Sequence, residues 1–334
     1  MAGQGVELLA HLDDLAVMGF AEVVLRLPFF LRLERRLDRV LSEEAVDLVI
    51  PVDYPGFNLR MTRRAHEKNI PIVYYIAPQV WAWKAGRAAR LARMADRIAV
   101  ILPFEEELFR REGGHAVFVG HPLLSEDAPS VNRSTFCHRH GLDAGRPILA
   151  LFPGSRAQEI ERHLQLFLEA GRRLRSRHPG LQLAVARAGS LRVDLPDDPG
   201  ISLVSDGRSL LRHARAAIVK SGTTTLEAAL EGTPFVVAYR THPLTYFLAR
   251  RLVQVDHVAL ANLVAGSRVV PELLQGEVTP VALAEALEPF LGDTPQRSAA
   301  VTGLGTVRER LGEPGAAERV VQLVDEVLDR DAGA

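Results

Sequence analysis

Cysteine is almost absent from this sequence, which contains one, Cys137, among 334 residues. A single cysteine excludes an intramolecular disulfide and fits a reducing compartment, where Cys137 would be a small buried apolar side chain rather than a nucleophile. Long apolar runs are absent too, because the most apolar early stretch, residues 23–33, is interrupted by arginines and a proline. That stretch is far too short to cross a bilayer, so we expect a protein that is soluble or lies on a membrane surface.

The chain also lacks an excess of either charge, since 40 lysines and arginines oppose 41 aspartates and glutamates and leave a net charge of −1. Arginine is dense locally, as in residues 31–39, but the overall balance gives no reason to expect nucleic acid as a partner. No Asp-x-Asp motif stands where it could bind a metal, and we expect no cofactor. The hydrophobic content of 47% is enough for real cores in a chain long enough for two domains.

Short apolar runs alternate with helical patterns from residue 46 onward, which is typical of a parallel sheet with helices on both faces. Residues 120–147 interrupt this series with turn-forming and polar residues and are predicted to be a linker. A second alternating series begins at residue 148, and the last sixty or so residues carry helical apolar stripes. We therefore predict an α/β fold of two facing doubly wound domains, residues 1–125 and 126–334, the second with carboxyl-terminal helices.

One strand-to-helix turn is a candidate ligand site. Residues 216–219 form an apolar run of strand type, and residues 226–230 have helical spacing, so the chain turns at Ser221, Gly222 and Thr223. Thr224 and Glu227 have the spacing of a capping box, which predicts a helix start whose amides and dipole attract an anion. Because Gly222 lets a ligand approach the backbone, these three turn residues could contact a phosphate. An ordinary βα turn, capped for stability alone, remains the alternative.

Two further motifs follow predicted strands. Gly154, Ser155 and Arg156 close the strand that begins at residue 148, and Asp53 follows the first strand of the other domain. Ligands of open α/β sheets bind beyond the carboxyl ends of strands, and a cleft between two such domains is the usual site. An arginine and a helix start facing a carboxylate would suit a diphosphate leaving group opposite a general base. The alternatives are a surface role for Arg156 and a helix-capping role for Asp53.

Seven motifs follow one another along nearly the whole chain: DYPGFNLR, YYIAPQVWAW, FVGHPL, LFPGSRAQEI, SGTTTLEAALEGTPFVVAYR, PLTYFLARRLV and NLVAGSRVVPELLQ. Together they resemble the lipid-A-disaccharide synthase family, inverting glycosyltransferases of the GT-B fold, whereas any one alone would be weak evidence. The resemblance implies transfer of 2,3-diacylglucosamine from its UDP carrier to 2,3-diacylglucosamine 1-phosphate. The products are a β-1,6-linked disaccharide, a precursor of the lipid anchor of lipopolysaccharide, and UDP.

The resemblance also implies roles for individual residues. The turn at residues 221–227 would hold the UDP of the donor, with Glu227 reaching the ribose hydroxyls and Arg156 neutralising the diphosphate. Asn262 matches a motif position tied to activity and would help to place the donor. Asp53 would accept the proton of the acceptor hydroxyl in a single inverting displacement without a metal. His121 is predicted to be a structural loop histidine, with a role as proton acceptor as the alternative.

The implied partners are the UDP-diacylglucosamine donor, the monosaccharide lipid acceptor and a membrane surface, which makes the expected location cytoplasmic and peripheral on the inner membrane; homodimerisation is left open. Residues 20–37 could meet the membrane, with arginines on one side and an apolar set on the other. That apolar set is Phe20, Val24, Leu27, Phe29, Phe30 and Leu33. A core helix with a solvated arginine face is the alternative.

Two other functional interpretations stay open. One is a different UDP-sugar transferase or an epimerase, because diphosphate binding at a helix start is common to enzymes of this fold. The other is a UDP-binding remnant without turnover. Family members normally begin with a strand and a GExSGD loop, and roughly fifty residues of that family pattern have no match in this sequence.

Overall fold

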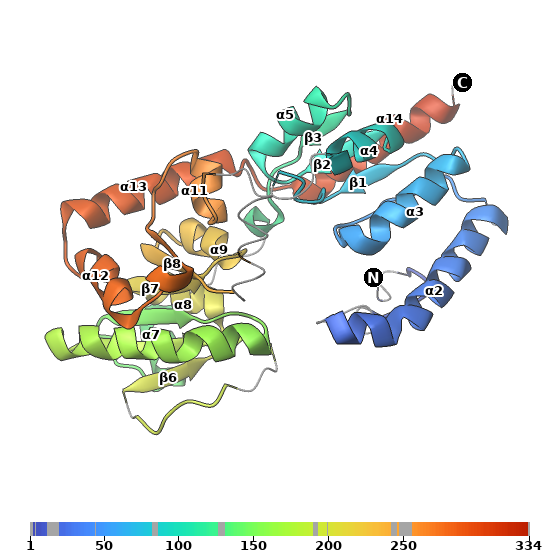
Figure 1. Ribbon diagram of the computed structural model, residues 1–334. Coiled ribbons are helices and arrows are strands. Elements are labelled where there is room, and N and C mark those ends of the chain that lie inside the picture. The colour runs from blue at the N-terminus through green and yellow to red at the C-terminus, as the bar shows by residue number, and fades with distance from the viewer. Residues whose placement is uncertain are drawn as a thin grey trace.

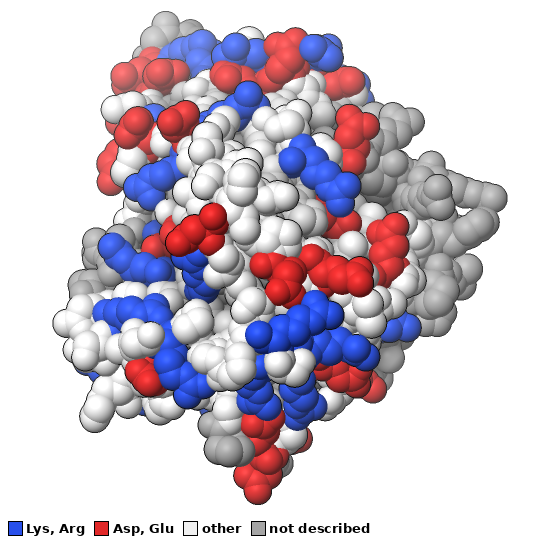
Figure 2. Space-filling view, turned by 90° about the vertical axis from the view of Figure 1, so that its left-hand side faces the viewer, with Lys and Arg blue, Asp and Glu red and all other residues white. Residues whose placement is uncertain are grey.

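The computed structural model describes residues 3, 5–11, 20–43, 45–81, 86–125, 131–189, 193–198, 200–241, 246 and 256–332. Within these ranges the chain forms two parallel sheets, each with helices packed against it, in two halves of the molecule (Figure 1). Acidic and basic side chains lie close to one another over the face that Figure 2 shows, in keeping with the nearly balanced composition. The predicted α/β class is confirmed.

The elements alternate between helix and strand in both halves. The first half contains α2 (Phe20–Glu43), α3 (Pro55–Glu67), β1 (Val73–Tyr75), α4 (Gly86–Met94), β2 (Arg97–Val100), α5 (Pro103–Arg111), β3 (Ala116–Phe118) and the 3-10 turn η2 (Pro122–Leu124). The second begins with α6 (Arg133–Arg139), β4 (Ile148–Phe152), α7 (Ala157–Arg177), β5 (Gln182–Ala186), β6 (Ile201–Val204), α8 (Gly207–His213), β7 (Ala216–Lys220), α9 (Thr224–Leu230) and β8 (Phe235–Tyr239). It ends with α11 (Leu260–Ala265), β9 (Glu272–Leu274), η3 (Gln275–Glu277), α12 (Pro280–Leu291), α13 (Pro295–Arg310) and α14 (Ala316–Ala332).

The second sheet has the strand order β6-β5-β4-β7-β8-β9, and all of its neighbouring strands are parallel. Numbered along the chain this is 3-2-1-4-5-6, the order of a dinucleotide-binding fold. The chain winds outward from β4 in one direction and from β7 in the other. The loops that follow these two adjacent strands therefore lie on either side of a crevice at the sheet's carboxyl edge.

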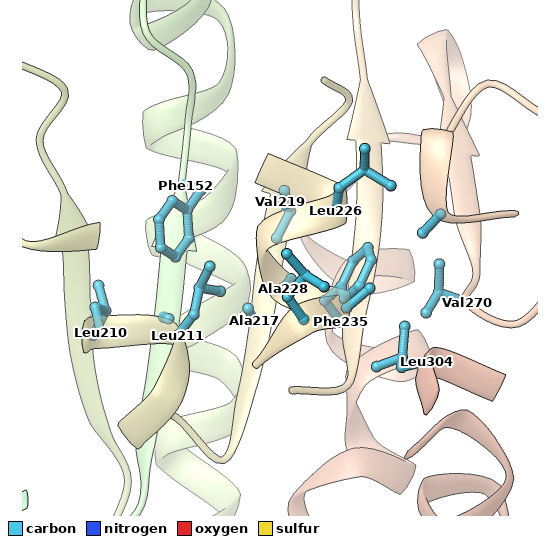
Figure 3. Close-up of a cluster of buried hydrophobic side chains, with 14 of the residues drawn as sticks. Phe152, Leu210, Leu211, Ala217, Val219, Leu226, Ala228, Phe235, Val270 and Leu304 are labelled. Carbon is cyan, nitrogen blue, oxygen red and sulfur yellow. The ribbon is translucent and has the colours of Figure 1, made fainter. Parts of the chain in front are cut away.

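Burial of both faces explains why the second sheet's strands are almost entirely apolar. Alternate residues of β4 belong to different cores: Leu149 and Leu151 pack with α7 and α12, whereas Ile148 and Phe152 pack with α8, α9 and α11. Figure 3 shows the latter core, where Phe152 and Leu211 lie near each other and Phe235 lies among residues of β7, α9 and α13. The second sheet, with helices packed on both of its faces, is thus a complete three-layer unit.

The first sheet has the order β1-β2-β3, and its described strands are also parallel. The predicted strand over residues 46–52 is only partly present, as two isolated parallel bridges from Val49 to Ile72 and from Val52 to Tyr75. Helices α3, α4 and α5 cover one face of this sheet. The sequence pattern thus identified the segment but overestimated how regularly it pairs.

The other face of the first sheet is covered by α14, the last helix of the chain. Val320, Leu323 and Val327 of α14 pack on Val73 and Ala99, and Figure 1 shows this red helix beside the blue and green strands. The predicted division into residues 1–125 and 126–334 stays a prediction. Part of the predicted linker, residues 120–147, is structured. Helix α6 buries Phe136 and Cys137 in the core that also contains residues of α8, α9 and α11.

Helix α2 packs on α3 through apolar side chains and through an ion pair between Glu34 and Arg64. Phe30 and Leu33 are buried against Phe57 and Met61, so these two members of the predicted membrane face point into the protein. Leu27 and Leu31 are exposed instead, at 50% and 44%. The side chains of Phe20 and Val24 lie outside the described part of the chain. None of the described helices is both long and apolar enough to cross a membrane.

Candidate functional site

The turn after β7 brings Ser221, Gly222 and Thr223 to the carboxyl edge of the second sheet. Gly222 has φ +155°, which side-chain-bearing residues rarely adopt, and its carbonyl accepts a 2.8 Å hydrogen bond from the Thr225 hydroxyl. Helix α9 begins at Thr224 with Thr223 as its N-cap and no side-chain cap. The predicted capping box of Thr224 and Glu227 is therefore wrong, because backbone bonds within the turn close the helix start.

The turn after β4 is built around a glycine that no other residue could replace without strain. Gly154 has φ +135°, and a Cβ atom there would lie 2.4 Å from the Glu159 Cβ. The close approach lets the Glu159 carboxylate accept a 3.0 Å hydrogen bond from the Ser155 amide. Glu159 thereby holds the loop that carries Arg156 against the first turn of α7.

Glu159 also joins this loop to β7. Its Oε1 atom lies 2.8 Å from Lys220 Nζ and 3.4 Å from Arg156 Nη1. Burial acts to raise the pKa of Glu159, but the Lys220 hydrogen bond and charge and the Ser155 amide hold it below its ordinary value. Lys220 was missed by the sequence analysis, although its place at the end of a buried strand, directly before Ser221, was a usable signal.

These two turns line a single cavity of about 600 Å³ at the crevice between β4 and β7. All of the residues predicted to contact the donor line it, namely Gly154, Ser155, Arg156, Ser221, Gly222, Thr223 and Glu227. Arg187, Arg208 and Lys220 add positive charge to the same walls, and Arg208 also pairs with Glu231 at 2.9 Å. We call this space the switch-point cavity. Its cations and exposed turn backbone can bind an anionic group.

A second cavity of about 540 Å³ lies between the two halves, and we call it the cleft cavity. Asp53 lines it from the first half, and Leu260 and Thr223 line it from the second. Thr223 belongs to both cavities, so the two spaces adjoin at the turn after β7. A ligand in the switch-point cavity could thus present a reactive atom to a second molecule in the cleft cavity.

Asp53 is held by its backbone and keeps its carboxylate available. Its φ is +47°, its amide donates to the Tyr75 carbonyl, and its own carbonyl accepts from Asn58 Nδ2 at 2.7 Å and from the Tyr74 hydroxyl. The Asp53 carboxylate has no hydrogen bond or ion pair within the described ranges. Helix α3 has Tyr54 at its N-cap and no side-chain cap. The alternative that Asp53 caps this helix is therefore wrong.

Two other titratable groups in the cleft cavity are buried. His121 accepts a 3.2 Å hydrogen bond at Nδ1 from the Leu123 amide, and burial lowers its pKa to about 4. His121 is thus a neutral cap of η2, as predicted for a structural loop histidine. Glu105, which the sequence analysis missed, accepts from the Trp81 indole at 3.0 Å and the Leu102 amide at 3.2 Å. Burial raises its pKa to about 7 despite these bonds.

Asn262 lies outside both cavities and is fully buried. Its Oδ1 accepts from the amides of Val269 and Val270, and its Nδ2 donates to the Val270 carbonyl and, at 2.7 Å, to Glu272 Oε1. Every hydrogen-bonding position of the side chain is therefore used within the protein. Asn262 acts on its surroundings through Glu272 and cannot touch a ligand in this arrangement.

Glu272, which Asn262 holds in place, is linked by hydrogen bonds to the turn that lines the switch-point cavity. It accepts hydrogen bonds from the Val258 and Ala259 amides at 2.9 and 3.0 Å, and the Val258 carbonyl accepts one from the Ser221 hydroxyl at 3.1 Å. A continuous chain of bonds thus leads from Asn262 to the turn after β7. Glu272 was a further residue that sequence analysis missed, and its motif offered no sign of this role.

The fold and the cavity at its switch point define the GT-B class. The solved glycotransferase of kitacinnamycin has a TM-score of 0.65 at 15% identity, covering 98% of this chain and 88% of that one. UDP-GlcNAc 2-epimerase from Neisseria meningitidis, solved with UDP-GlcNAc bound, has a TM-score of 0.64 at 10% identity, covering 93% and 83%. These likenesses establish the fold.

Sequence similarity establishes the family. The lipid-A-disaccharide synthetase family matches residues 1–325. The curated lipid-A-disaccharide synthase of Acidobacterium capsulatum is 40% identical over 351 aligned positions, which cover 99% of this chain and 88% of that protein. The chain belongs to the lipid-A-disaccharide synthetase family. One of the seven motifs, residues 243–253, lies outside the described ranges apart from Tyr246.

Proposed function

We propose that the protein is a glycosyltransferase that moves 2,3-diacylglucosamine from UDP to 2,3-diacylglucosamine 1-phosphate and releases UDP. Family membership supports this reaction. The observation that carries it is the placement of two turns, distant in sequence, around one cation-lined cavity that adjoins a second cavity containing Asp53. The arrangement suits a donor and an acceptor that meet at Thr223.

The donor's UDP would occupy the switch-point cavity. Arg156 and Lys220, which line this cavity, would neutralise the diphosphate, and the Ser221–Thr223 turn would offer backbone groups to the same oxygens. Glu227, which lines the cavity from α9, would bind the ribose hydroxyls. Asn262 is in this proposal a positioning residue, because it fixes Glu272 and through it the Ser221 side of the turn.

The chemical step would be one inverting displacement. The acceptor hydroxyl oxygen forms a bond to the anomeric carbon while the bond from that carbon to the diphosphate breaks and its electron pair leaves with UDP. Asp53 takes the hydroxyl proton, for which its carboxylate in the cleft cavity is suited because none of the described residues pairs with it. The cations of the switch-point cavity stabilise the charge that develops on the leaving group.

The test is a direct assay with both substrates, followed by mass spectrometry of the lipid products and measurement of released UDP. We expect disaccharide and UDP in equal amounts. Likeness to a UDP-GlcNAc 2-epimerase makes epimerisation the second candidate, and it would appear as an altered UDP-sugar without disaccharide. If UDP binds but neither product forms, the chain is a binding protein and the proposed transfer is wrong.

We also propose that the protein works at the cytoplasmic face of the inner membrane, where its acylated substrates would be found. Leu27 and Leu31 support this, since they are exposed one helical turn apart on α2, with exposed arginines at positions 32 and 35. Co-sedimentation with anionic liposomes should fall in a Leu27→Ser, Leu31→Ser variant that remains folded. Undiminished sedimentation would remove α2 from this role. Sedimentation velocity on the same samples decides whether the protein is a homodimer.

A further inference from the structure

Arg87 is the one lysine or arginine among the described residues that line the cleft cavity. The other ionisable groups among these described lining residues are Asp53, the buried Glu105 and His121, which burial keeps neutral. The cavity therefore has a carboxylate and a guanidinium as its accessible charges. A molecule with a hydroxyl at one end and an anion at the other has a preferred orientation in such a space.

Among the described residues, none pairs with Arg87 in a way that would explain its presence. It is exposed and makes no ion pair or hydrogen bond within the described ranges. By contrast, Arg64 pairs with Glu34 at 2.8 Å, and Arg175 pairs with Asp198 at 2.7 Å. Helix α4 is anchored through Ala88, Leu91 and its other buried apolar residues, so its packing does not depend on Arg87.

We propose that Arg87 binds the phosphate of the acceptor and thereby sets which end of the acceptor reaches Asp53. This inference rests on the proposed transfer reaction. A guanidinium can bind two phosphate oxygens at once, which a neutral donor cannot do. The Asp53 carboxylate repels the same phosphate, so the phosphate lies toward Arg87 and the sugar hydroxyl toward Asp53. Arg87 is then a binding residue that selects phosphorylated acceptors.

The experiment compares two acceptors that differ only in the phosphate, 2,3-diacylglucosamine with and without its 1-phosphate. Wild type, Arg87→Ala, Arg87→Lys and Arg90→Ala are assayed on both. Arg90 is the matched control, because it is exposed on the same helix and does not line the cavity. Arg87→Ala should lose about tenfold to hundredfold in kcat/KM on the phosphorylated acceptor and less than about threefold on the other. Arg87→Lys should recover part of the loss, and Arg90→Ala should change neither value.

Equal losses on both acceptors, or no loss on the phosphorylated one, would overturn the role of Arg87 while leaving the transfer reaction intact. The affinity of each variant for UDP, measured by calorimetry, should be unchanged, and a parallel loss of UDP binding would also overturn it. If wild type turned over neither acceptor, the proposed function itself would fail. Titration with glucosamine 1-phosphate then decides on Arg87 separately, because binding that Arg87→Ala does not weaken contradicts the phosphate site.

Discussion

The switch-point cavity and the cleft cavity hold their charges in different ways. In the switch-point cavity, Glu159 is fixed by Lys220 and by the Ser155 amide, and the Ser221 hydroxyl is tied to Val258. In the cleft cavity, Asp53 and Arg87 have no ion-pair partner in the described part of the chain. The protein itself fixes the charges of the first cavity, whereas no described residue pairs with those of the second.

Removal of the Asp53 carboxylate should give the largest effect, a loss of kcat. It should leave UDP binding in the switch-point cavity unchanged. We expect Asp53→Ala to lower kcat by about 10² to 10⁴, because general-base assistance is lost. UDP affinity measured by calorimetry should stay within about twofold. If donor affinity fell in parallel with kcat, Asp53 would be a structural residue and the division of roles between the cavities would be wrong.

Asn262→Ala should lower both the stability of the protein and its affinity for UDP, because it removes buried hydrogen bonds that support the switch-point cavity. The variant leaves the buried Val270 amide without its partner and removes one hydrogen bond each from the Val269 amide, the Val270 carbonyl and Glu272. A buried polar group left unpaired costs about 1–3 kcal/mol, and each further lost bond about 0.5–1.5 kcal/mol. We expect the free energy of unfolding in urea to fall by about 3 kcal/mol or more. UDP binding should weaken as well, because the Val258 contact to Ser221 loosens. A variant as stable as wild type would contradict the buried network.

Arg156→Ala should weaken UDP binding about tenfold to hundredfold, equivalent to about 1.5–3 kcal/mol for a lost charge-assisted contact. Stability should change little, since the Arg156 side chain is 59% exposed. Arg162→Ala is the control, because Arg162 is exposed on α7 and does not line the cavity. Calorimetric titration with UDP measures both variants. The same affinity for wild type and Arg156→Ala would remove this arginine from the donor site.

Glu105 should give the most gradual effect, a slope in stability with pH. Its pKa is raised to about 7 in the folded protein, above its ordinary value of 4.5, so the folded state holds a proton that the unfolded state releases. The stability this contributes is present below pH 4.5 and is lost as pH rises to about 7, by at most about 1.4 kcal/mol per pH unit. Urea unfolding of wild type and Glu105→Gln between pH 5 and 7.5 measures it. Parallel curves for the two proteins would show that Glu105 is ionised when folded.

Local patterns were enough to predict that the turns after β4 and β7 lie at one edge of the second sheet. Gly154 and Gly222 each follow a buried strand, and the carboxyl ends of parallel strands meet at one edge of the sheet. The order of strands and turns along the chain was therefore enough to predict that the two glycines lie at the same edge. The capping box failed because Thr224 and Glu227 have the right spacing but the wrong place relative to the helix start. Spacing reports sequence distance, whereas the cap depends on the backbone angles of Thr223.

Contacts between distant segments could not be predicted in this way. Lys220 is identified only once Glu159 is brought 2.8 Å from it, and Glu105 only once its helix is buried against Trp81. Asn262 was assigned to the donor site from its motif, but its side chain faces Glu272 in the core. Motif membership indicates that a residue matters, and tertiary packing decides whether it meets a ligand.

The return of α14 to the first sheet has a consequence for how the protein is made. Val73, Ala99 and Val119 form a sheet face whose cover includes Val320 and Val327. Arg319, which donates to the Val119 carbonyl at 2.7 Å, follows that residue by 200 positions. A chain emerging from the ribosome therefore exposes this apolar face through most of its synthesis, and truncation before residue 316 should leave the first half prone to aggregation.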